Sequence, residues 1–268
     1  IGIAMGITGT DVAKGAADMV LTDDNFASIE KAVEEGRGIF ANIKKTIYFL
    51  ISSNIAEVLA MFLIICIGLP TPLIAIHLLW INLITDSLPA IALGMDKTSK
   101  DVLDEKPRNP EESIFAHGGM RLIIARGAIL TVSVLIAYFA AFAFNGAYSF
   151  SAIKALSESD PNVLHQAQTM AFTTLAFGEL FHMFAMRNTE KSAFSVFASG
   201  NVMMFAAFFV GIALQFAVIE IPALQIIFNT ANLSGYEWLI TAICSLLPLL
   251  WQEIIAAVKA LKRRKRNA

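Results

Sequence analysis

The sequence has few cysteines and few charged residues, and both shortages restrict its function. Only two cysteines occur among the 268 residues, Cys66 and Cys244, and both stand in apolar runs. Their spacing fits neither a zinc site nor a disulfide framework, so we expect two buried thiols that behave as small apolar side chains. The formal net charge is −2, which argues against a nucleic-acid partner for the chain as a whole.

Charged residues make up only 16% of the chain, whereas hydrophobic residues make up 56%. The mean hydropathy is +0.65, which is too apolar for an ordinary soluble domain of this length. An initiator methionine and a signal peptide are also lacking, because Ile1 stands inside a strand-like run. We therefore expect a membrane-embedded piece of a longer chain.

Six stretches approach the ~20 apolar residues that cross ~30 Å of hydrocarbon. They cover residues 46–67, 72–93, 122–144, 166–186, 202–219 and 236–257. The first two carry several polar side chains, so they fit a membrane only when other helices surround them. The sequence therefore predicts a mainly α-helical bundle of six membrane spans.

Basic residues distinguish the two sides of this predicted bundle. The connections 94–119 and 187–200 and the tail 259–268 together hold 12 Lys and Arg residues, whereas the connections on the other side hold only Lys154. Positive charge accumulates on the cytoplasmic side of membrane proteins, so we expect the C-terminus to be cytoplasmic. The run KRRKR directly after a span is then more often a topology anchor than a patch for nucleic acid or acidic lipid.

The first 45 residues have a different character. IGIAMG and MVL are short strand candidates, and TGTDVAKGAADM between them has the composition of a capped helix. No proline follows before Pro70, so one helix can run from soluble territory into the first span. Over residues 27–65 such a helix would be about 58 Å long, and it could transmit movement from a soluble domain into the membrane.

Three carboxylates stand inside otherwise apolar spans: Glu57, Asp86 and Glu179. Ionisable groups are expensive at that depth, so they usually face a bundle interior, a partner or an ion path. Other polar side chains share their helix faces at spacings of three and four residues; these are Asn54, Asn82 and Thr85. Carboxylate and amide oxygens suit a hard cation such as Ca²⁺, so the sequence predicts a cation site inside the membrane.

The second predicted span contains Pro89, which has no N–H to donate to the carbonyl of Thr85. Free backbone carbonyls at membrane depth are tolerated where they line a cavity or an ion path. A proline kink also serves plain helix packing. Beside Asn82 and Asp86, we interpret this proline as part of the cation site.

These segments resemble one known family. IGIAMGITGTDVAKGAADMVLTDDNFASI and EEGRGIFANIKK are similar to the end of the phosphorylation domain and the stalk helix of a P-type ATPase. LISSNIAEVL and GLPTPLIAIHLLWINLITDSLPAIALGMD resemble the fifth and sixth membrane helices of type II cation pumps, nearest to the sarco/endoplasmic-reticulum calcium pumps and their bacterial relatives. KPRNPEESI and TMAFTTLAFGEL extend the resemblance over essentially the whole chain.

The resemblance implies a domain organisation. Residues 1–26 would be the end of an α/β (HAD-like) phosphorylation domain, and residues 27–45 would be the stalk helix. Residues 46–258 would form family helices five to ten, followed by a basic cytoplasmic tail at 259–268. The partners implied are the transported cation, the lipid bilayer and the remaining N-terminal domains and helices of the same pump, in the plasma membrane if the source is bacterial.

Roles of single residues follow from the same resemblance. The family's first calcium site corresponds to Asn54, Glu57, Thr85, Asp86 and Glu179. The second corresponds to Asn82 and Asp86, and the rest of it lies upstream of Ile1. Two positions depart from the animal pumps: Ser87 replaces a usual glycine, and His182 stands where an amide is common. We expect His182 to be packed and neutral.

The function implied is ATP-driven export of Ca²⁺ by alternating access. The family's phosphorylated aspartate, its nucleotide-binding domain and its magnesium loop precede IGIAMG, so we expect this segment to bind neither ATP nor Mg²⁺. Buried carboxylates without a cation tend to take up protons, which makes H⁺ counter-transport a hypothesis. Three alternatives remain open: a Mn²⁺ pump, a channel or secondary transporter without ATPase activity, and a non-transporting scaffold.

Overall fold

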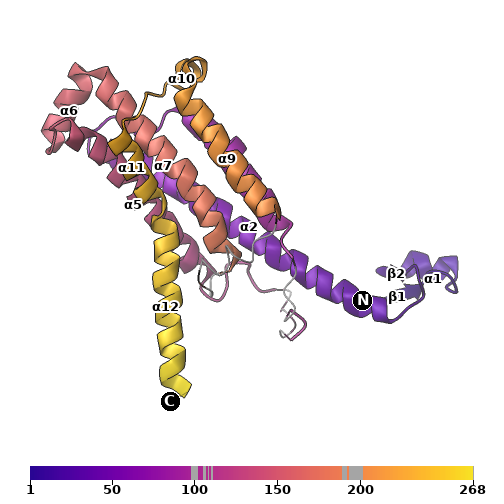
Figure 1. The fold of residues 1–268 in the computed structure, drawn as a ribbon. Coiled ribbons are helices and arrows are strands. Elements are labelled where there is room, and N and C mark those ends of the chain that lie inside the picture. The colour runs from indigo at the N-terminus through magenta and orange to yellow at the C-terminus, as the bar shows by residue number, and fades with distance from the viewer. Residues whose placement is uncertain are drawn as a thin grey trace.

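The computed structural model describes residues 1–97, 102–104, 107, 109, 111–188, 192 and 202–267, with side chains as far as Leu261. Its elements in chain order are β1 (Ile3–Met5), α1 (Asp11–Ala16), β2 (Met19–Leu21), α2 (Ala27–Cys66), α3 (Ala75–Trp80), η1 (Ile81–Thr85), α4 (Ser87–Gly94), α5 (Gly119–Phe144), α6 (Phe150–Ser159), α7 (Pro161–Arg187), α9 (Val202–Glu220), α10 (Pro222–Phe228), α11 (Gly235–Ser245) and α12 (Leu247–Asn267). The described part is mainly helical, and most of its long helices gather into one bundle, from which the first half of α2 and the end of α12 project (Figure 1).

The N-terminal residues form a small strand–helix–strand unit, as their composition predicts. β1 and β2 pair in parallel, with Ile3 opposite Met19, and α1 connects them. The hydroxyl of Thr10 accepts a hydrogen bond from the backbone N–H of Ala13 and so caps α1. The unit lies at the far end of α2, away from the bundle (Figure 1).

The turn after β2 is held by one carboxylate. Asp24 has a φ of 49° and accepts hydrogen bonds from the backbone N–H groups of Ile7 and Thr8 and from the Thr8 hydroxyl. The Ile7 bond is the main reason that the pKa of Asp24 falls to about 2. The turn therefore depends on an ionised Asp24.

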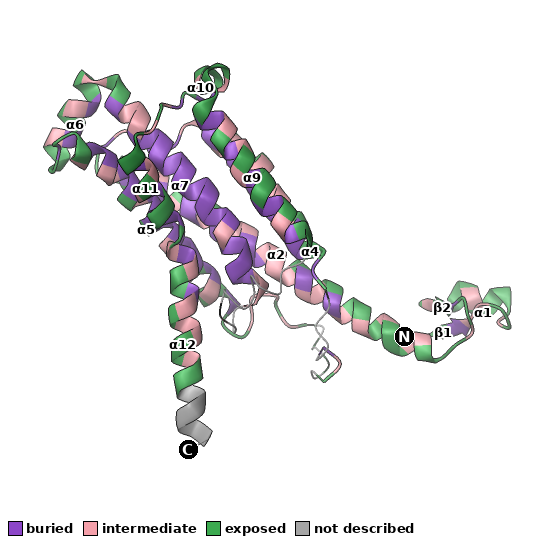
Figure 2. Cartoon of the chain, in the orientation of Figure 1, coloured by how far each residue is buried: buried purple, intermediate pink, exposed green. Residues whose placement is uncertain are grey.

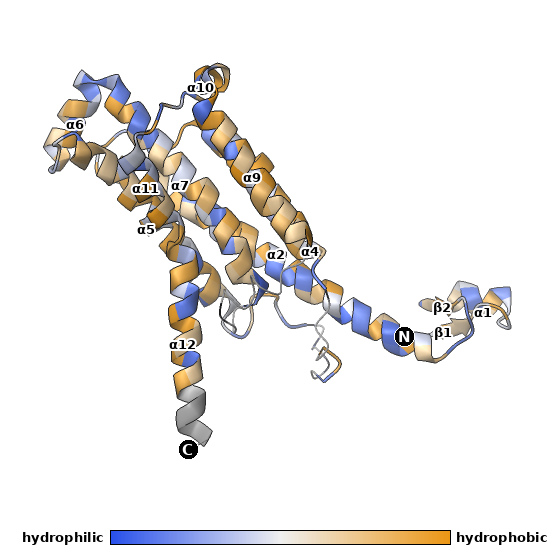
Figure 3. Ribbon diagram, in the orientation of Figure 1, coloured by the Kyte–Doolittle hydropathy of each residue, from blue (hydrophilic) through white to orange (hydrophobic). Residues whose placement is uncertain are grey.

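The predicted rod is present as a single helix. α2 runs for 40 residues without a break, which corresponds to about 60 Å. Its first half is polar and exposed and its second half packs into the bundle (Figures 2 and 3). The exposed half thus connects the N-terminal unit to the apolar half of the molecule.

The centre of the bundle consists of α2, α5 and α7, which pack against one another. α7 is buried along most of its length (Figure 2), and α9 and α11 cover its other sides. Glycines permit two close approaches. A Cβ at Gly127 of α5 would lie 2.7 Å from Ile55 of α2, and one at Gly211 of α9 would lie 2.7 Å from Leu180 of α7.

Five helices of the described part are long and apolar enough to cross a membrane: α2, the Ala75–Gly94 segment, α5, α9 and the Gly235–Leu261 segment. Five of the six predicted spans coincide with them. The remaining segment, 166–186, lies in α7, which is 27 residues long but is not among these five. That it spans a membrane stays a prediction.

The structure also corrects and extends the expectations. Cys244 is buried as expected, but Cys66 is exposed, because it ends α2 between Ile65 and Ile67, which are also exposed. The connections 145–165 and 220–235 contain the helices α6 and α10, which hydropathy did not predict. Four residues of the basic connections lie outside the described residues: Lys100, Lys106, Arg108 and Lys191.

Candidate metal centre

Three carboxylates from three different helices meet inside the bundle. Glu57 comes from α2, Asp86 from the junction of η1 and α4, and Glu179 from α7. One oxygen of each lies within 4.8 Å of the others, and their residues are 5%, 1% and 0% exposed. The sequence predicted that these three would share a site, and the fold brings them together; we call them the carboxylate cluster.

Glu57 is held by an amide from the neighbouring segment. Asn82 Nδ2 lies 3.2 and 3.1 Å from the two carboxylate oxygens of Glu57 and also donates to the carbonyl of Leu78. Asn82 itself is exposed. An exposed amide group therefore orients the buried carboxylate of Glu57.

A π turn places Asp86 and Thr85. η1 covers Ile81–Thr85, and the backbone N–H of Asp86 donates to the carbonyl of Ile81 at 2.9 Å, five residues earlier. Such turns insert one extra residue into a helix and are frequent at functional sites. Pro89 indicates an irregular helix at the carbonyl of Thr85, four residues before it. The observed π turn begins one helical turn earlier, at Ile81.

Glu179 is enclosed at the centre of the bundle. Its Oε2 accepts a hydrogen bond of 3.0 Å from the hydroxyl of Thr85, which joins α7 to η1. Among the described residues, Oε1 of Glu179 and both oxygens of Asp86 have no hydrogen-bond partner. Three buried acceptor atoms are thus available to a cation or to protons.

Two residues of α2 depart from the sequence prediction in opposite directions. Asn54 is exposed, and its amide nitrogen donates to the carbonyl of Leu50 in its own helix; in the described residues it makes no hydrogen bond to the carboxylate cluster. Ser53, which the sequence analysis did not select, is fully buried and lies beside Asp86. Its position four residues before Glu57 was the signal available in the sequence.

Ser87 and His182, the two departures expected from the resemblance, have local roles. Ser87 donates to the carbonyl of Asn82 at 3.2 Å and so supports the wide turn. His182 is fully buried, with Nε2 2.8 Å from the hydroxyl of Ser52 and its ring stacked on Phe49. It is packed, as expected, and it joins α7 to α2 one turn from Glu179.

The chemistry of the cluster suits a hard divalent cation. Its ligand atoms are oxygens, and neither histidine nor cysteine belongs to it. Ca²⁺ binds oxygens at 2.3–2.6 Å, so two ligands of one ion stand at most about 5 Å apart, and the three oxygens here all lie within 4.8 Å of one another. Without a cation, three such carboxylates would repel one another unless they bound protons.

Comparison with known proteins gives a consistent picture. The family model described as "Cation transporting ATPase, C-terminus" matches residues 70–258. The chain is 46% identical to "Calcium-transporting ATPase 1" of Bacillus cereus over 259 residues, which is 97% of this chain and 29% of that protein. It is 41% identical to "Calcium-transporting ATPase" of Bacillus subtilis over 248 residues, 92% of this chain and 26% of that protein.

A fungal protein is similar as well. The "Endoplasmic reticulum calcium ATPase srcA" of Aspergillus fumigatus is 36% identical over 253 residues, 89% of this chain and 26% of that protein. The chain therefore spans less than a third of the length of these curated relatives. Because the family model covers most of the chain, including η1 and the segments that carry Asp86 and Glu179, this protein belongs to the family of cation-transporting ATPase C-terminal regions.

Proposed function

We propose that this chain is the membrane and ion-binding part of an ATP-driven pump that exports Ca²⁺ from the cytoplasm. The observation that carries the proposal is the carboxylate cluster, in which three helices each contribute one buried carboxylate within 4.8 Å. A permanent cluster of this kind is expensive inside a membrane unless a cation occupies it for part of the cycle. The names of the similar proteins support Ca²⁺ as that cation.

The proposed topology has six spans, with α7 as the one that apolarity does not identify. α7 is surrounded by other helices, so it needs little apolar surface toward lipid. Residues 1–26 then belong to the end of an HAD-like phosphorylation domain, and 27–45 form the stalk. The basic tail 259–268 lies in the cytoplasm.

For the ions, we assign Glu57, Thr85, Asp86 and Glu179 to a first site. Asn82 and Asp86 belong to a second, which ligands upstream of Ile1 complete. Asn54 joins the first site only after its amide leaves the carbonyl of Leu50, to which it now donates at 2.7 Å. Binding of the ion supplies the reason for that change, since the amide oxygen is a suitable ligand.

The transport step follows from the positions of these residues. Glu57 stands on the same continuous helix as the stalk, so movement of the stalk displaces one ligand relative to Asp86 and Glu179. Separation of the three carboxylates weakens cation binding and exposes the ion to the far side. The emptied carboxylates then take up protons because burial disfavours their charge, and these protons return in the opposite direction.

ATP and Mg²⁺ act in the upstream domains under this proposal, and this segment binds neither. The chain contributes the ion ligands and the stalk, and the remaining domains contribute the phosphorylated aspartate. Energy from phosphorylation reaches the carboxylate cluster through α2.

The test is phosphoenzyme formation by the full-length protein. We expect Ca²⁺ to activate phosphorylation from ATP in the unmodified protein and not in Asp86→Asn, which keeps the shape but removes the charge assigned to both ions. Phosphorylation from inorganic phosphate should persist in the variant. Asp104→Asn, at an exposed position outside the bundle, is the matched control. Normal Ca²⁺ activation of Asp86→Asn would remove Asp86 from the site.

Mn²⁺ transport is the second candidate, because Mn²⁺ also accepts oxygen ligands. Comparing the cation dependence of phosphorylation for Ca²⁺ and Mn²⁺ separates the two pumps. A channel or secondary transporter would instead move ions with no phosphorylated intermediate at all, and that result would overturn the pump proposal.

A further inference from the structure

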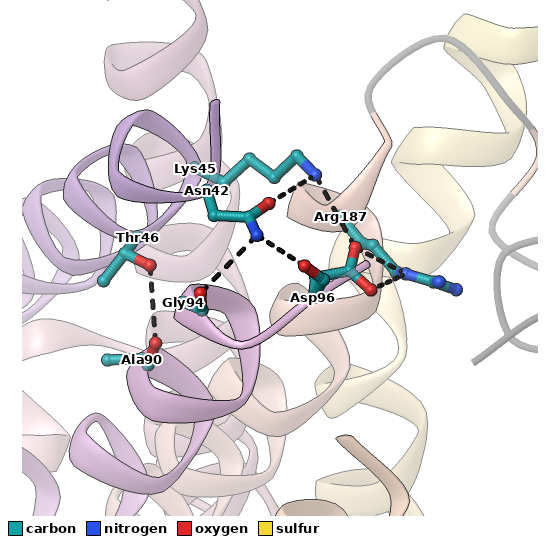
Figure 4. Close-up of polar contacts among 7 residues, drawn as sticks. All are labelled: Asn42, Lys45, Thr46, Ala90, Gly94, Asp96 and Arg187. Carbon is teal, nitrogen blue, oxygen red and sulfur yellow. Dashed lines mark hydrogen bonds and ion pairs between the residues drawn. The ribbon is translucent and has the colours of Figure 1, made fainter. Parts of the chain in front are cut away.

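A second polar cluster lies where α4 and α7 end against the middle of α2. Asp96 follows α4 by two residues, and its side chain is 4% exposed. Nε of Arg187, the last residue of α7, lies 3.0 and 2.9 Å from its two carboxylate oxygens. Nζ of Lys45 on α2 lies 3.6 Å from one of them. Figure 4 shows both cations converging on Asp96; with Asn42 they form what we call the Asp96 cluster.

The backbone at Asp96 is held from α2 as well. Asn42 Nδ2 donates to the carbonyl of Asp96 at 2.6 Å and lies 3.5 Å from that of Gly94. One turn further along α2, the hydroxyl of Thr46 lies 3.3 Å from the carbonyl of Ala90 (Figure 4). These contacts repeat at the spacing of one helical turn, so they fix the register of α2 against α4.

The Asp96 cluster and the carboxylate cluster draw on the same three helical segments. Asp96, Lys45 and Arg187 lie ten, twelve and eight residues from the carboxylate of their own segment. At a rise of 1.5 Å per residue these separations correspond to roughly 12–18 Å. The two clusters therefore lie at two positions along one three-helix unit. A shift of one helix along its axis at the Asp96 cluster also moves that helix's carboxylate in the carboxylate cluster.

We propose that Asp96 is a positioning residue. It fixes the positions of Glu57, Asp86 and Glu179 relative to one another along the helix axes, and thereby sets the affinity of the pump for its cation. The proposal rests on the proposed function. Asp96 touches no ion; it acts by fixing α2 and α7 to the end of α4. Movement of the stalk must then either carry α4 and α7 with it or separate Lys45 from Asp96.

The charges explain why a carboxylate is required. Asp96 is nearly enclosed, whereas the side chains of Arg187 and Lys45 are 14% and 28% exposed. Loss of the negative charge leaves two cations close together with less compensation. An amide at this position preserves the shape of the side chain but not its attraction to Lys45 and Arg187. It should therefore loosen the three-helix unit without creating a cavity.

The experiment measures the Ca²⁺ concentration that gives half-maximal phosphorylation from ATP in the full-length protein. We expect Asp96→Asn to change it by at least about five-fold, the lower range of measured coupling between sites. Phosphorylation from inorganic phosphate should stay near normal, because the site of phosphorylation lies elsewhere. Asp104→Asn, in the same connection but exposed, should behave as the unmodified protein.

A milder pair of variants covers the case in which Asp96→Asn does not fold. Lys45→Gln removes one cation of the cluster, whereas Lys44→Gln removes its neighbour, which lies over the ring of Tyr48 instead. Lys45→Gln should shift half-activation in the same direction as Asp96→Asn, and Lys44→Gln should not. The double variant Asp96→Asn/Arg187→Gln should shift it by less than the two single changes combined.

Two results would overturn the proposal. One is an unchanged half-activating concentration in folded Asp96→Asn and Lys45→Gln, even if less protein reaches the membrane. The other is strict additivity of the Asp96 and Arg187 variants. Failure of the proposed function is recognised separately, because the unmodified protein would then show no cation-activated phosphorylation in the first place.

Discussion

The replacement Glu179→Gln separates two effects of the carboxylate cluster that have opposite signs. The amide retains the size of the side chain and can still accept the hydrogen bond from Thr85, which is 3.0 Å long. It removes one of three negative charges that lie within 4.8 Å of one another. We expect the protein without cation to become more stable and the stabilisation by Ca²⁺ to become smaller.

The distances give the size of the first effect. Two unit charges 4.8 Å apart repel by about 3.5 kcal/mol at an effective dielectric constant of ~20. Glu179 takes part in two of the three pairs, so with all three groups ionised its charge accounts for about 7 kcal/mol of repulsion at the 4.8 Å limit, and for more at shorter distances. Bound protons relieve much of this. We expect a net gain of about 1 kcal/mol or more without cation, which raises Tm in the chelator.

The second effect follows from binding linkage. A cation at 100 times its Kd stabilises the folded protein by about 2.7 kcal/mol, so Ca²⁺ should raise the Tm of the unmodified protein. Glu179→Gln should lose most of this increment at the same Ca²⁺ concentration and reduce the cooperativity of Ca²⁺ activation. Purified full-length protein is melted in a chelator and in Ca²⁺. Glu220→Gln, at an exposed position at the end of α9, is the control.

Two outcomes would refute this reasoning. If Glu179→Gln lowers Tm in the chelator as much as in Ca²⁺, its carboxylate stabilises the fold and is not under electrostatic strain. If the variant keeps the full Ca²⁺ increment, Glu179 does not bind the ion. Separately, a Hill coefficient near one in the unmodified protein would contradict cooperative binding of two ions.

Three further predictions concern other parts of the chain. Ile39→Pro should slow or abolish ion transport in the full-length protein while ATP still binds, because proline breaks the exposed half of α2 at a cost of ~3 kcal/mol or more. Ile39→Ala is the control. Normal transport per ATP in a folded proline variant would refute coupling through a rigid α2. Gly211→Val should destabilise the protein by about 1–3 kcal/mol, since even the Cβ of the new side chain would lie 2.7 Å from Leu180. In a melting experiment, the double variant Gly211→Val/Leu180→Ala should recover part of the lost stability. No recovery would mean that the contact with Leu180 is not the cause of the destabilisation. Asp24→Asn should increase hydrogen exchange at the Ile7 amide at neutral pH. Because the folded-state pKa of Asp24 is lowered from 3.8 to about 2, the difference in exchange between variant and unmodified protein should be present above pH 4 and disappear as pH falls toward 2. A difference in exchange that does not depend on pH would contradict the role of the Asp24 charge.

Much of the fold could be predicted from local pattern. The strand–helix–strand start follows from two short apolar runs around a capped helix, and α2 follows from the absence of proline between Phe26 and Pro70. Five spans follow from the length of apolar stretches. In each case the information lies within one segment, so no knowledge of its neighbours is needed.

The cluster of three carboxylates was predictable for a similar reason. The segments around Glu57, Asp86 and Glu179 are otherwise suited to hydrocarbon, so each carboxylate had to face the interior of a helix bundle. A single bundle has a single interior, so the three were expected to meet there. Their hydrogen-bond partners were less predictable. Asn82 binds Glu57 rather than acting with Asp86 alone, and Asn54 turns back to its own helix, because side-chain rotamers depend on neighbours that periodicity does not specify.

The Asp96 cluster could not be predicted at all. Asp96 stands at the start of a connection rich in charge, where an exposed aspartate is the ordinary expectation. It is buried because α7 ends beside it and the middle of α2 passes it, and these helices supply Arg187 and Lys45. Contacts between residues 51 and 91 positions apart leave no periodic trace in the sequence.

α7 shows most clearly why hydropathy and burial differ in this protein. It is the helix that apolarity does not identify as a span, and yet 20 of its 27 residues are buried. Hydropathy selects helices that present apolar side chains to lipid, whereas α7 presents its surface to α5, α9 and α11. Its threonines show the consequence, because Thr169 and Thr173 donate to carbonyls four residues earlier in their own helix. A helix whose polar groups are satisfied in this way can carry Glu179 into the centre of the bundle, where other helices surround it.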